Sequence, residues 1–273
     1  MTQVELNATT LDYEVAGTGE PVLLIGTGPL ADSFMPFLSQ EGLLQRYQLI
    51  TYRQRRFDSS HDTMPVSFSV HAEDAAMLLD HLKVRRAHIA GHSTGASIAL
   101  QLALEHPAAV HTLILLEPPL PASPGAGEFF ARVEPAVAAY RAGDSVSAMS
   151  QFLSVVCSLE WPKCRSVIEA CTPGATEVAV RNAENFFESY LPAIAGWSFG
   201  AEDAASIQQP VLSVIGTGSE KFFLDGHELL RAWLPQFEEC RIREAAHLLH
   251  MQQPEQVISG IQAFLARHPI PNP

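Results

Sequence analysis

Ser93 is the residue whose surroundings most clearly suggest chemistry, because it lies at the centre of residues 91–95 (GHSTG). The apolar run 87–90 (AHIA) precedes this pentapeptide and a helical pattern follows it, which predicts a strand, a tight turn and a helix. Flanking glycines would let the strand and the helix approach, and the turn would present the hydroxyl above the sheet edge. The pattern alone arises by chance in about one of ten such chains. Its position between a strand and a helix is what favours a nucleophile.

A serine hydroxyl is a weak nucleophile until a base takes its proton, and histidine can do so near neutral pH. The chain has eleven histidines. His247 lies in a predicted loop before the last helical pattern, and His250 follows it closely, so both are candidate bases. His92, inside the pentapeptide, is interpreted as a packing or hydrogen-bonding residue, and the other histidines as structural or surface residues.

A carboxylate that orients the histidine would complete such a site. Glu117 follows the buried run 110–116 (VHTLILL), whose strand we expect to lie beside the one that ends at Ser93. A charged residue at the mouth of so apolar a strand needs a partner. Glu117 is therefore a candidate acid, with Glu220 and Asp225 as alternatives, and the other interpretation is that Glu117 only caps the strand or is solvated.

The elements that must position these residues follow an alternating pattern. Short apolar runs predict strands and longer patterns of helical spacing predict helices between them. The predicted strands are 4–13, 21–25, 47–52, 87–90, 110–116 and 210–215, and the predicted helices are 71–82, 96–106, 228–234 and 255–267. Such alternation predicts an α/β fold with a mostly parallel central sheet flanked by helices on both faces.

Residues 121–205 interrupt this alternation, because strand signals vanish and the segment becomes helical, aromatic and rich in alanine. We predict a helical insertion over the end of the sheet, with residues 1–120 and 206–273 forming the core. Aromatic residues at helical spacing more often form core than ligand contacts. Trp161 and Trp197 are nevertheless candidate substrate contacts in this segment.

These features together resemble the α/β-hydrolase superfamily, in particular its serine-nucleophile members with a lid. The resemblance extends over nearly the whole chain, and the segment 24–29 (LIGTGP) corresponds to the family's oxyanion strand-loop. It implies that Ser93 is the nucleophile and that the N–H groups of Thr27 and Thr94 form an oxyanion hole. It favours His247 over His250 as general base, because Pro254 follows seven residues after His247. It also implies that residues 121–205 form a cap.

Three departures from the family pattern are visible. The family's usual aspartate after the strand at 210–215 is absent, and because some relatives carry the acid one strand earlier, the resemblance makes Glu117 our choice of acid. Ile25-Gly26 stands where His-Gly is common. Residues 56–60 (RFDSS) replace a common G-x-G-x-S turn.

The segment 52–56 (YRQRR) is the densest basic cluster of the chain. Arg53, Arg55 and Arg56 should lie on the same sheet edge as Ser93 and could bind an acidic group of a substrate. The alternative interpretation is a solvated turn whose arginines pair with Asp58 and Asp62.

Composition excludes several classes of protein. The chain has 273 residues and a net charge of −13, with no long basic run, which argues against nucleic acid and anionic membranes as partners. Residues 1–6 lack a basic and apolar leader, and no run approaches the roughly 18 apolar residues of a membrane span, so we expect a cytoplasmic protein. The four cysteines fit no metal pattern and are interpreted as free thiols. We expect no metal or cofactor, and the sequence does not predict an oligomeric state.

The function favoured by these residues is hydrolysis of a carboxylic ester, lactone or thioester through an acyl-enzyme on Ser93. The expected substrate is a small hydrophobic molecule that contains a carbonyl group. A lyase or cyclase using the same residues as acid and base is the alternative, and a non-catalytic ligand binder is less favoured. A serine at position 93 argues against epoxide hydrolases and haloalkane dehalogenases, which attack with an aspartate in this fold.

Overall fold

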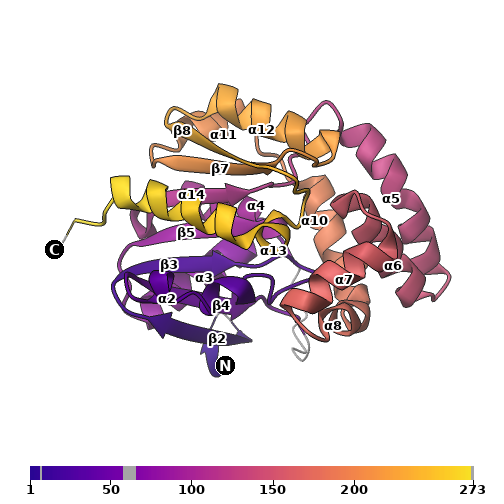
Figure 1. Ribbon diagram of the computed structural model, residues 1–273, viewed down its shortest axis with the longest axis horizontal. Coiled ribbons are helices and arrows are strands. Elements are labelled where there is room, and N and C mark those ends of the chain that lie inside the picture. Colours follow the sequence, from indigo (N-terminus) through magenta and orange to yellow (C-terminus); the bar gives the residue numbers. More distant parts are fainter. Residues whose placement is uncertain (7, 58–65, 272–273) are drawn as a thin grey trace.

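The structure is a computed structural model that describes residues 1–6, 8–57 and 66–271. Its strands form one eight-stranded sheet in the order β1-β2-β4-β3-β5-β6-β7-β8 (Figure 1). The strands are β1 (Thr2–Leu6), β2 (Thr9–Gly17), β3 (Glu20–Ile25), β4 (Tyr47–Arg53), β5 (Ala87–His92), β6 (Val110–Leu116), β7 (Val211–Gly216) and β8 (Phe237–Ile242). β2 pairs antiparallel with β1 and β4, and all other pairs are parallel. The predicted α/β class with a mostly parallel sheet is confirmed.

Helices cover both faces of the sheet because successive strand residues point to opposite sides. Leu23 and Ile25 of β3 pack with α3 (Phe68–His81), α4 (Thr94–Glu105) and α12 (Lys221–Trp233). Val22 and Leu24 of the same strand pack with the helices of the other face. Those helices are α1 (Met35–Leu38), α2 (Glu41–Leu44), α13 (Leu249–Gln252) and α14 (Pro254–Arg267), and the short helix η1 (Pro107–Ala109) precedes β6.

The single strand predicted over residues 4–13 is wrong, because two antiparallel strands occupy this region. Ala8 has a φ of 57°, the left-handed conformation, and the chain reverses there so that Leu6 pairs with Thr9. The apolar pattern continues through the reversal, since residues of both strands contribute to the same buried face. Val4 and Leu11, which face each other across the pair, both contact the core beneath α3 and α4.

A run of helices connects β6 to β7. The earlier ones lie beyond the carboxyl ends of the parallel strands, at the right of Figure 1, and the last one lies beside α12 at the top. They are α5 (Ala126–Arg141), α6 (Ser145–Cys157), α7 (Trp161–Cys171), α8 (Ala175–Arg181), α9 (Ala183–Asn185), the π-helical turn η2 (Phe186–Tyr190), α10 (Leu191–Gly196) and α11 (Ala201–Ser206). Residues of α5 to η2 form a separate apolar cluster with Phe222 and Phe223 of α12. Ile194 and Ala204, further along, pack instead into the core around α3 and α4.

Candidate active site

The turn from β5 to α4 holds Ser93 in a strained backbone conformation, with φ 54° and ψ −122°. A Cβ atom at Gly91 would lie 2.2 Å from the Gly95 carbonyl oxygen, and one at Gly95 would lie 2.1 Å from the Ile25 carbonyl oxygen. Any side chain at either position would clash with main chain, so glycine is required on both sides of the serine. The Ser93 N–H donates to the Leu116 carbonyl oxygen at 2.8 Å, which fixes the turn to β6.

Glu117 directly follows β6 and contacts His247, with 2.8 Å between Glu117 Oε2 and His247 Nδ1. The other carboxylate oxygen accepts hydrogen bonds from the Gly216 N–H at 2.8 Å and the Ser219 hydroxyl at 2.5 Å. Only 2% of Glu117 is exposed, so each of these partners compensates for a charge removed from water. The backbone of Glu117 also has a positive φ, 50°, like that of Ser93 after the neighbouring strand.

The two alternative acids, Glu220 and Asp225, form ion pairs with basic side chains away from His247. Glu220 forms an ion pair with Arg132 and accepts a hydrogen bond from the Ser158 hydroxyl at 2.9 Å. Asp225 pairs with Lys221 one turn away on α12. The structure therefore brings Glu117, and neither alternative, to His247.

The two other histidines near the site are buried and electrically neutral. His250 packs against Phe34, with 5.3 Å between the ring centroids, and burial lowers its pKa to about 3. Burial also holds the pKa of His92 well below its ordinary value, with a further contribution from His250 and His247. His92 Nε2 lies 2.8 Å from the His247 carbonyl oxygen, so this nitrogen carries the proton and donates to the loop of the candidate base. Phe223 stacks on the His247 ring at 4.0 Å between centroids and restricts its rotation.

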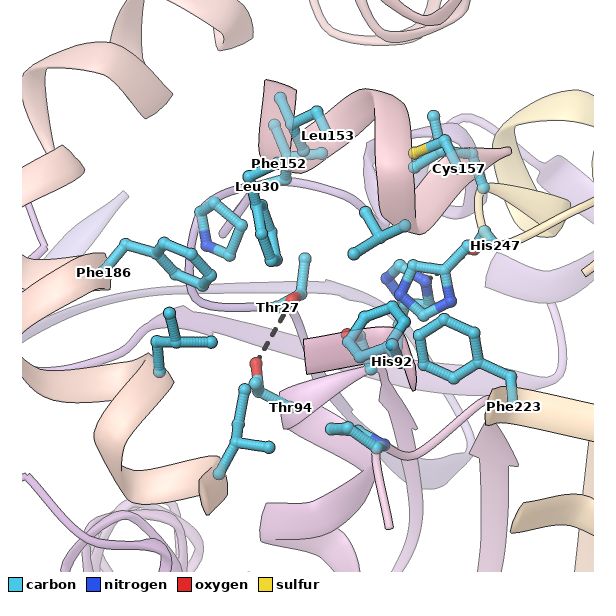
Figure 2. Close-up of a pocket in the computed structure, with 18 of the residues that line it drawn as sticks. Thr27, Leu30, His92, Thr94, Phe152, Leu153, Cys157, Phe186, Phe223 and His247 are labelled. Atoms are coloured by element: carbon cyan, nitrogen blue, oxygen red, sulfur yellow. Dashed lines mark hydrogen bonds between the residues drawn. The ribbon is translucent and has the colours of Figure 1, made fainter. Parts of the chain in front are cut away.

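Thr27 and Thr94 lie side by side on the loop after β3 and at the start of α4. Their hydroxyl oxygens are 3.1 Å apart (Figure 2). The Gly28 N–H donates to Thr94 Oγ1 at 2.9 Å. Because Thr94 is the first residue of its helix, its own N–H has no partner within the helix. The positive end of the helix dipole therefore faces the space next to Ser93.

Ser93 and His247 line one narrow cavity. Figure 2 shows Phe152 and Phe186 on one side of Thr27 and Thr94, and Phe223 and His247 on the other. Among the described residues, no Asp, Glu, Lys or Arg side chain lines this cavity. Its apolar wall includes Leu30, Phe129, Phe152, Leu153, Phe186 and Phe223.

The three arginines expected to contact the substrate lie elsewhere. Arg53 forms an ion pair with Asp32 at 2.7 Å, and the fully buried Arg55 pairs with Asp74 at 2.6 Å. Arg56 Nη1 donates to the hydroxyl of Ser189 in η2 at 2.9 Å. None of the three lines the cavity, because carboxylates and the helical segment engage their guanidinium groups. Asp58 and Asp62, the partners suggested by the sequence, lie outside the described residues.

The two tryptophans do not line the cavity either. Trp161 begins α7 and packs against the apolar cluster of the helical segment. Trp197 Nε1 donates to Gln101 Oε1 at 2.9 Å, and its ring packs edge-on against Phe68.

Two residues that contribute to the site were not predicted from the sequence. Ser219, which donates to Glu117, lies just after the Gly-Thr-Gly at 216–218, which repeats the sequence of residues 26–28. Phe223, which stacks on His247, belongs to the first turns of α12, where only the later part was predicted as helix. The repeated turn was a usable signal for Ser219, whereas the contact of Phe223 depends on tertiary packing.

Comparison with known proteins agrees with this architecture. The alpha/beta hydrolase fold family matches residues 20–254, and the chain belongs to this family. A thermophilic esterase from Thermogutta terrifontis superimposes with a TM-score of 0.79 and 23% identity, covering 98% of this chain and 100% of that one. The enol-lactonase from Burkholderia xenovorans LB400 gives a TM-score of 0.80 and 17% identity, over 97% and 100% of the two chains. At these identities the likeness shows the fold.

A curated relative, "Putative carbamate hydrolase RutD" of Azorhizobium caulinodans, is 38% identical over 108 residues. The match covers 39% of this chain and 40% of that protein. The chain thus matches about two fifths of the length of this relative.

Two further features concern the described residues as a whole. Within residues 1–6, 8–57 and 66–271, no helix has the length and apolar character needed to cross a membrane. In the same part of the chain, no group of three or more His, Cys, Asp or Glu side chains is arranged to hold a metal ion.

Proposed function

We propose that this protein is a serine hydrolase that cleaves a carboxylic ester, lactone or thioester through an acyl-enzyme on Ser93. The observation that carries the proposal is the hydrogen bond between Glu117 and His247 beside a cavity that Ser93 also lines. A buried carboxylate held by three donors, next to a histidine and a strained serine, is the arrangement that activates a hydroxyl.

In this mechanism, Glu117 accepts the Nδ1–H of His247 and leaves Nε2 free to take the Ser93 proton. Ser93 Oγ attacks the carbonyl carbon, and the N–H groups of Thr27 and Thr94 stabilise the negative oxygen. His247 then gives the proton to the leaving oxygen or sulfur. A water molecule, deprotonated by His247, attacks the acyl-enzyme and releases the acid together with the free serine.

The cavity favours an uncharged substrate that is apolar close to the scissile carbonyl. Transfer of an ionised group into a wall without a charged or strongly polar partner would be unfavourable. The aromatic side chains Phe129, Phe152 and Phe186 limit the space, which favours a compact acyl or leaving group. The names esterase and enol-lactonase among the similar structures are consistent with such substrates. The name of the RutD relative adds carbamates to the compounds worth assaying.

We further propose that residues 121–205 act as a cap over this cavity. Helices α5 and α6 supply Phe129 and Phe152 to its wall, and η2 supplies Phe186, so these helices keep bulk water from the carbonyl. Exclusion of water strengthens the electrostatic interactions with the developing oxyanion.

The proposal is tested by labelling with a fluorophosphonate and by turnover of p-nitrophenyl esters of increasing chain length. We expect a single covalent adduct on Ser93 by intact mass and peptide mapping, and loss of labelling and turnover in Ser93→Ala. The matched control is Ser97→Ala, one turn along α4, whose hydroxyl is buried with no partner among the described residues. Ester turnover that survives Ser93→Ala would exclude the acyl-enzyme. Absence of both labelling and turnover in the wild-type protein would favour a lyase, a cyclase or a binding protein.

A further inference from the structure

The loop after β3 is connected by two buried side chains to the helical segment, the run from α5 to α11. Gln54 Nε2 donates to the Gly26 carbonyl oxygen at 2.7 Å, and the Tyr190 hydroxyl donates to Gln54 Oε1 at 2.7 Å. Gln54 is 3% exposed and Tyr190 1% exposed, so water does not compete for either bond. Gly26 immediately precedes Thr27, whose N–H is proposed to bind the oxyanion.

The direction of this chain of hydrogen bonds is fixed by chemistry. A carbonyl oxygen can only accept, so the amide nitrogen of Gln54 must face Gly26, and its oxygen must face Tyr190. Burial raises the pKa of Tyr190 well above its ordinary value, so its hydroxyl stays protonated and donates. Each donor in the chain therefore meets an acceptor, and neither side chain can rotate without losing a buried bond.

Tyr190 also contacts the loop directly. A Cβ atom at Gly28 would lie 2.8 Å from the Tyr190 ring, so the ring rests against the backbone of that glycine. On its other side the ring stacks on His71 of α3, with 5.1 Å between centroids and 22° between planes. Tyr190 is thus clamped between α3 and the loop at residues 26–28.

The turn that carries Tyr190 faces the substrate cavity as well. η2 is a π-helical turn, a rare conformation that occurs often at functional sites, and its first residue, Phe186, lines the cavity. One short turn therefore contributes both to the cavity wall and to the support of the loop that contains Thr27.

From these contacts we propose that Gln54 and Tyr190 are positioning residues that hold the Gly26–Gly28 loop so that the Thr27 N–H points at the oxyanion. The inference rests on the proposed hydrolase function, because it assigns a task to that oxyanion hole. It means that the helical segment acts on the chemical step by fixing a donor, in addition to enclosing the substrate. Donors that are preorganised in this way do not have to reorient as charge develops.

The test compares Gln54→Met, which removes both bonds, with Tyr190→Phe, which removes only the more distant bond. Loss of a direct oxyanion donor lowers kcat by about 10²–10³-fold, so a residue acting through the loop should have a smaller effect. We expect kcat on a p-nitrophenyl ester to fall about tenfold in Gln54→Met and about threefold in Tyr190→Phe, with KM within twofold of wild type. The double variant should equal Gln54→Met, because the Tyr190 hydroxyl then has no partner left to lose.

Tyr140→Phe is the matched control, since Tyr140 stacks on Phe187 of the same turn but does not line the cavity. It should change kcat less than twofold. Effects of Gln54→Met and Tyr190→Phe that multiply in the double variant, or a raised KM with unchanged kcat, would overturn the proposal.

Amide hydrogen exchange provides a readout that does not depend on activity. Peptides covering residues 24–30 should exchange faster in Gln54→Met than in wild type or Tyr140→Phe. Unchanged exchange there would overturn the positioning role, even in an active enzyme. Failure of the wild-type protein to react with esters or fluorophosphonate would overturn the proposed function instead, and the exchange result would still decide the role of Gln54.

Discussion

Two loops of this protein share the sequence Gly-Thr-Gly and lie at the ends of parallel strands, yet their N–H groups face different kinds of negative charge. After β7, the Gly216 N–H donates to Glu117, a carboxylate that is part of the folded protein. After β3, the Thr27 N–H is proposed to bind an oxyanion that exists only during the reaction. The difference comes from their places in the sheet, because β3 lies beside β5, which leads to Ser93, while β7 lies beside β6. Equal local sequence therefore does not imply equal function.

The loops also differ in how they are held. The N–H groups of Thr217 and Gly218 donate to main-chain carbonyls of Ile242 and Ala245, at 2.9 Å each. The loop at 26–28 has one main-chain bond, from the Leu30 N–H to the Thr27 carbonyl oxygen at 3.1 Å, and is otherwise held by side chains, since Gly28 donates to Thr94 Oγ1 and Gly26 accepts from Gln54. Substitution of side chains should consequently disturb the loop at 26–28, called the first loop below, more than the loop at 216–218, called the second loop. The following predictions test this contrast.

The largest effect on kcat is expected at Glu117, the carboxylate that accepts a hydrogen bond from the second loop, at residues 216–218. Glu117→Gln keeps the size of the side chain but removes the charge that orients His247 and stabilises its protonated form. Loss of that charge in a related arrangement lowers kcat by about 10⁴-fold, and we expect a fall of about 10³–10⁴-fold here. Steady-state ester turnover measures it, with Asp225→Asn as the control expected to stay within twofold. Equal small effects of the two substitutions would show that Glu117 is not the acid.

A smaller effect is expected in the first loop from Thr94→Val, which keeps the main-chain N–H but removes the acceptor of the Gly28 N–H. Leaving a buried donor unsatisfied costs about 1–3 kcal/mol, which the loop can relieve by shifting the Gly28 N–H toward another acceptor. Because that shift would also displace the Thr27 N–H, kcat should fall about 10- to 100-fold. Thr217→Val is the matched change in the second loop, where the threonine is exposed, and should alter kcat less than twofold. If Thr217→Val were as harmful as Thr94→Val, the contrast between the loops would be wrong.

Ser219→Ala should have a milder effect, because Glu117 keeps the Gly216 N–H and His247 as partners. The loss of one hydrogen bond to a charged group, about 1.5 kcal/mol, corresponds to a kcat reduction of about tenfold or less. Ser206→Ala, at an exposed serine of α11, is the control for turnover and for thermal stability. No change in kcat for Ser219→Ala would mean that the second loop does not tune the carboxylate.

The smallest effect on turnover is expected for His250→Leu, less than threefold, because the His250 ring packs against Phe34, Phe37 and His92. Its effect on stability should depend on pH. Burial lowers its pKa to about 3 from the 6.5 of the unfolded chain, so the unfolded state binds more protons below pH 6.5. The wild-type unfolding free energy should therefore decrease as pH falls, by about 2 kcal/mol from this residue at pH 5.

Urea denaturation at pH 7 and pH 5 measures this dependence, which should be weaker in His250→Leu. An abolished turnover in this variant would instead identify His250 as the base.

Sequence patterns were sufficient for the parts of the protein set by local spacing. The alternation of strands and helices gave the fold, and the glycines around Ser93 predicted the turn whose close contacts require them. Glu117 could be chosen from the apolar strand before it together with the family resemblance, since a charge at the end of such a strand needs a partner.

Long-range packing determined what the sequence could not show. The arginines at 53 and 55 were interpreted as candidate substrate contacts or as partners of the nearby Asp58 and Asp62, but Asp32 and Asp74, about 20 residues away in the sequence, pair with them. The reversal at Ala8 was hidden because both strands keep the same apolar face. The edge strand β8 was not predicted, since its exposed, charged residues lack the apolar run of the central strands.

The direct pairing of β6 with β7 has a consequence for modularity. Leu113 to Leu116 align with Val211 to Val214, although all of α5 to α11 lies between these strands in the chain. Parallel neighbours are ordinarily joined by a single crossover of a dozen or more residues. The helical segment is thus an enlarged crossover that leaves the carboxyl end of β6 and returns along the face of the sheet to the amino end of the neighbouring strand β7. Evolution or design could exchange it for a segment of another size, changing which molecules fit, while the register that brings Glu117 to Gly216 stays the same.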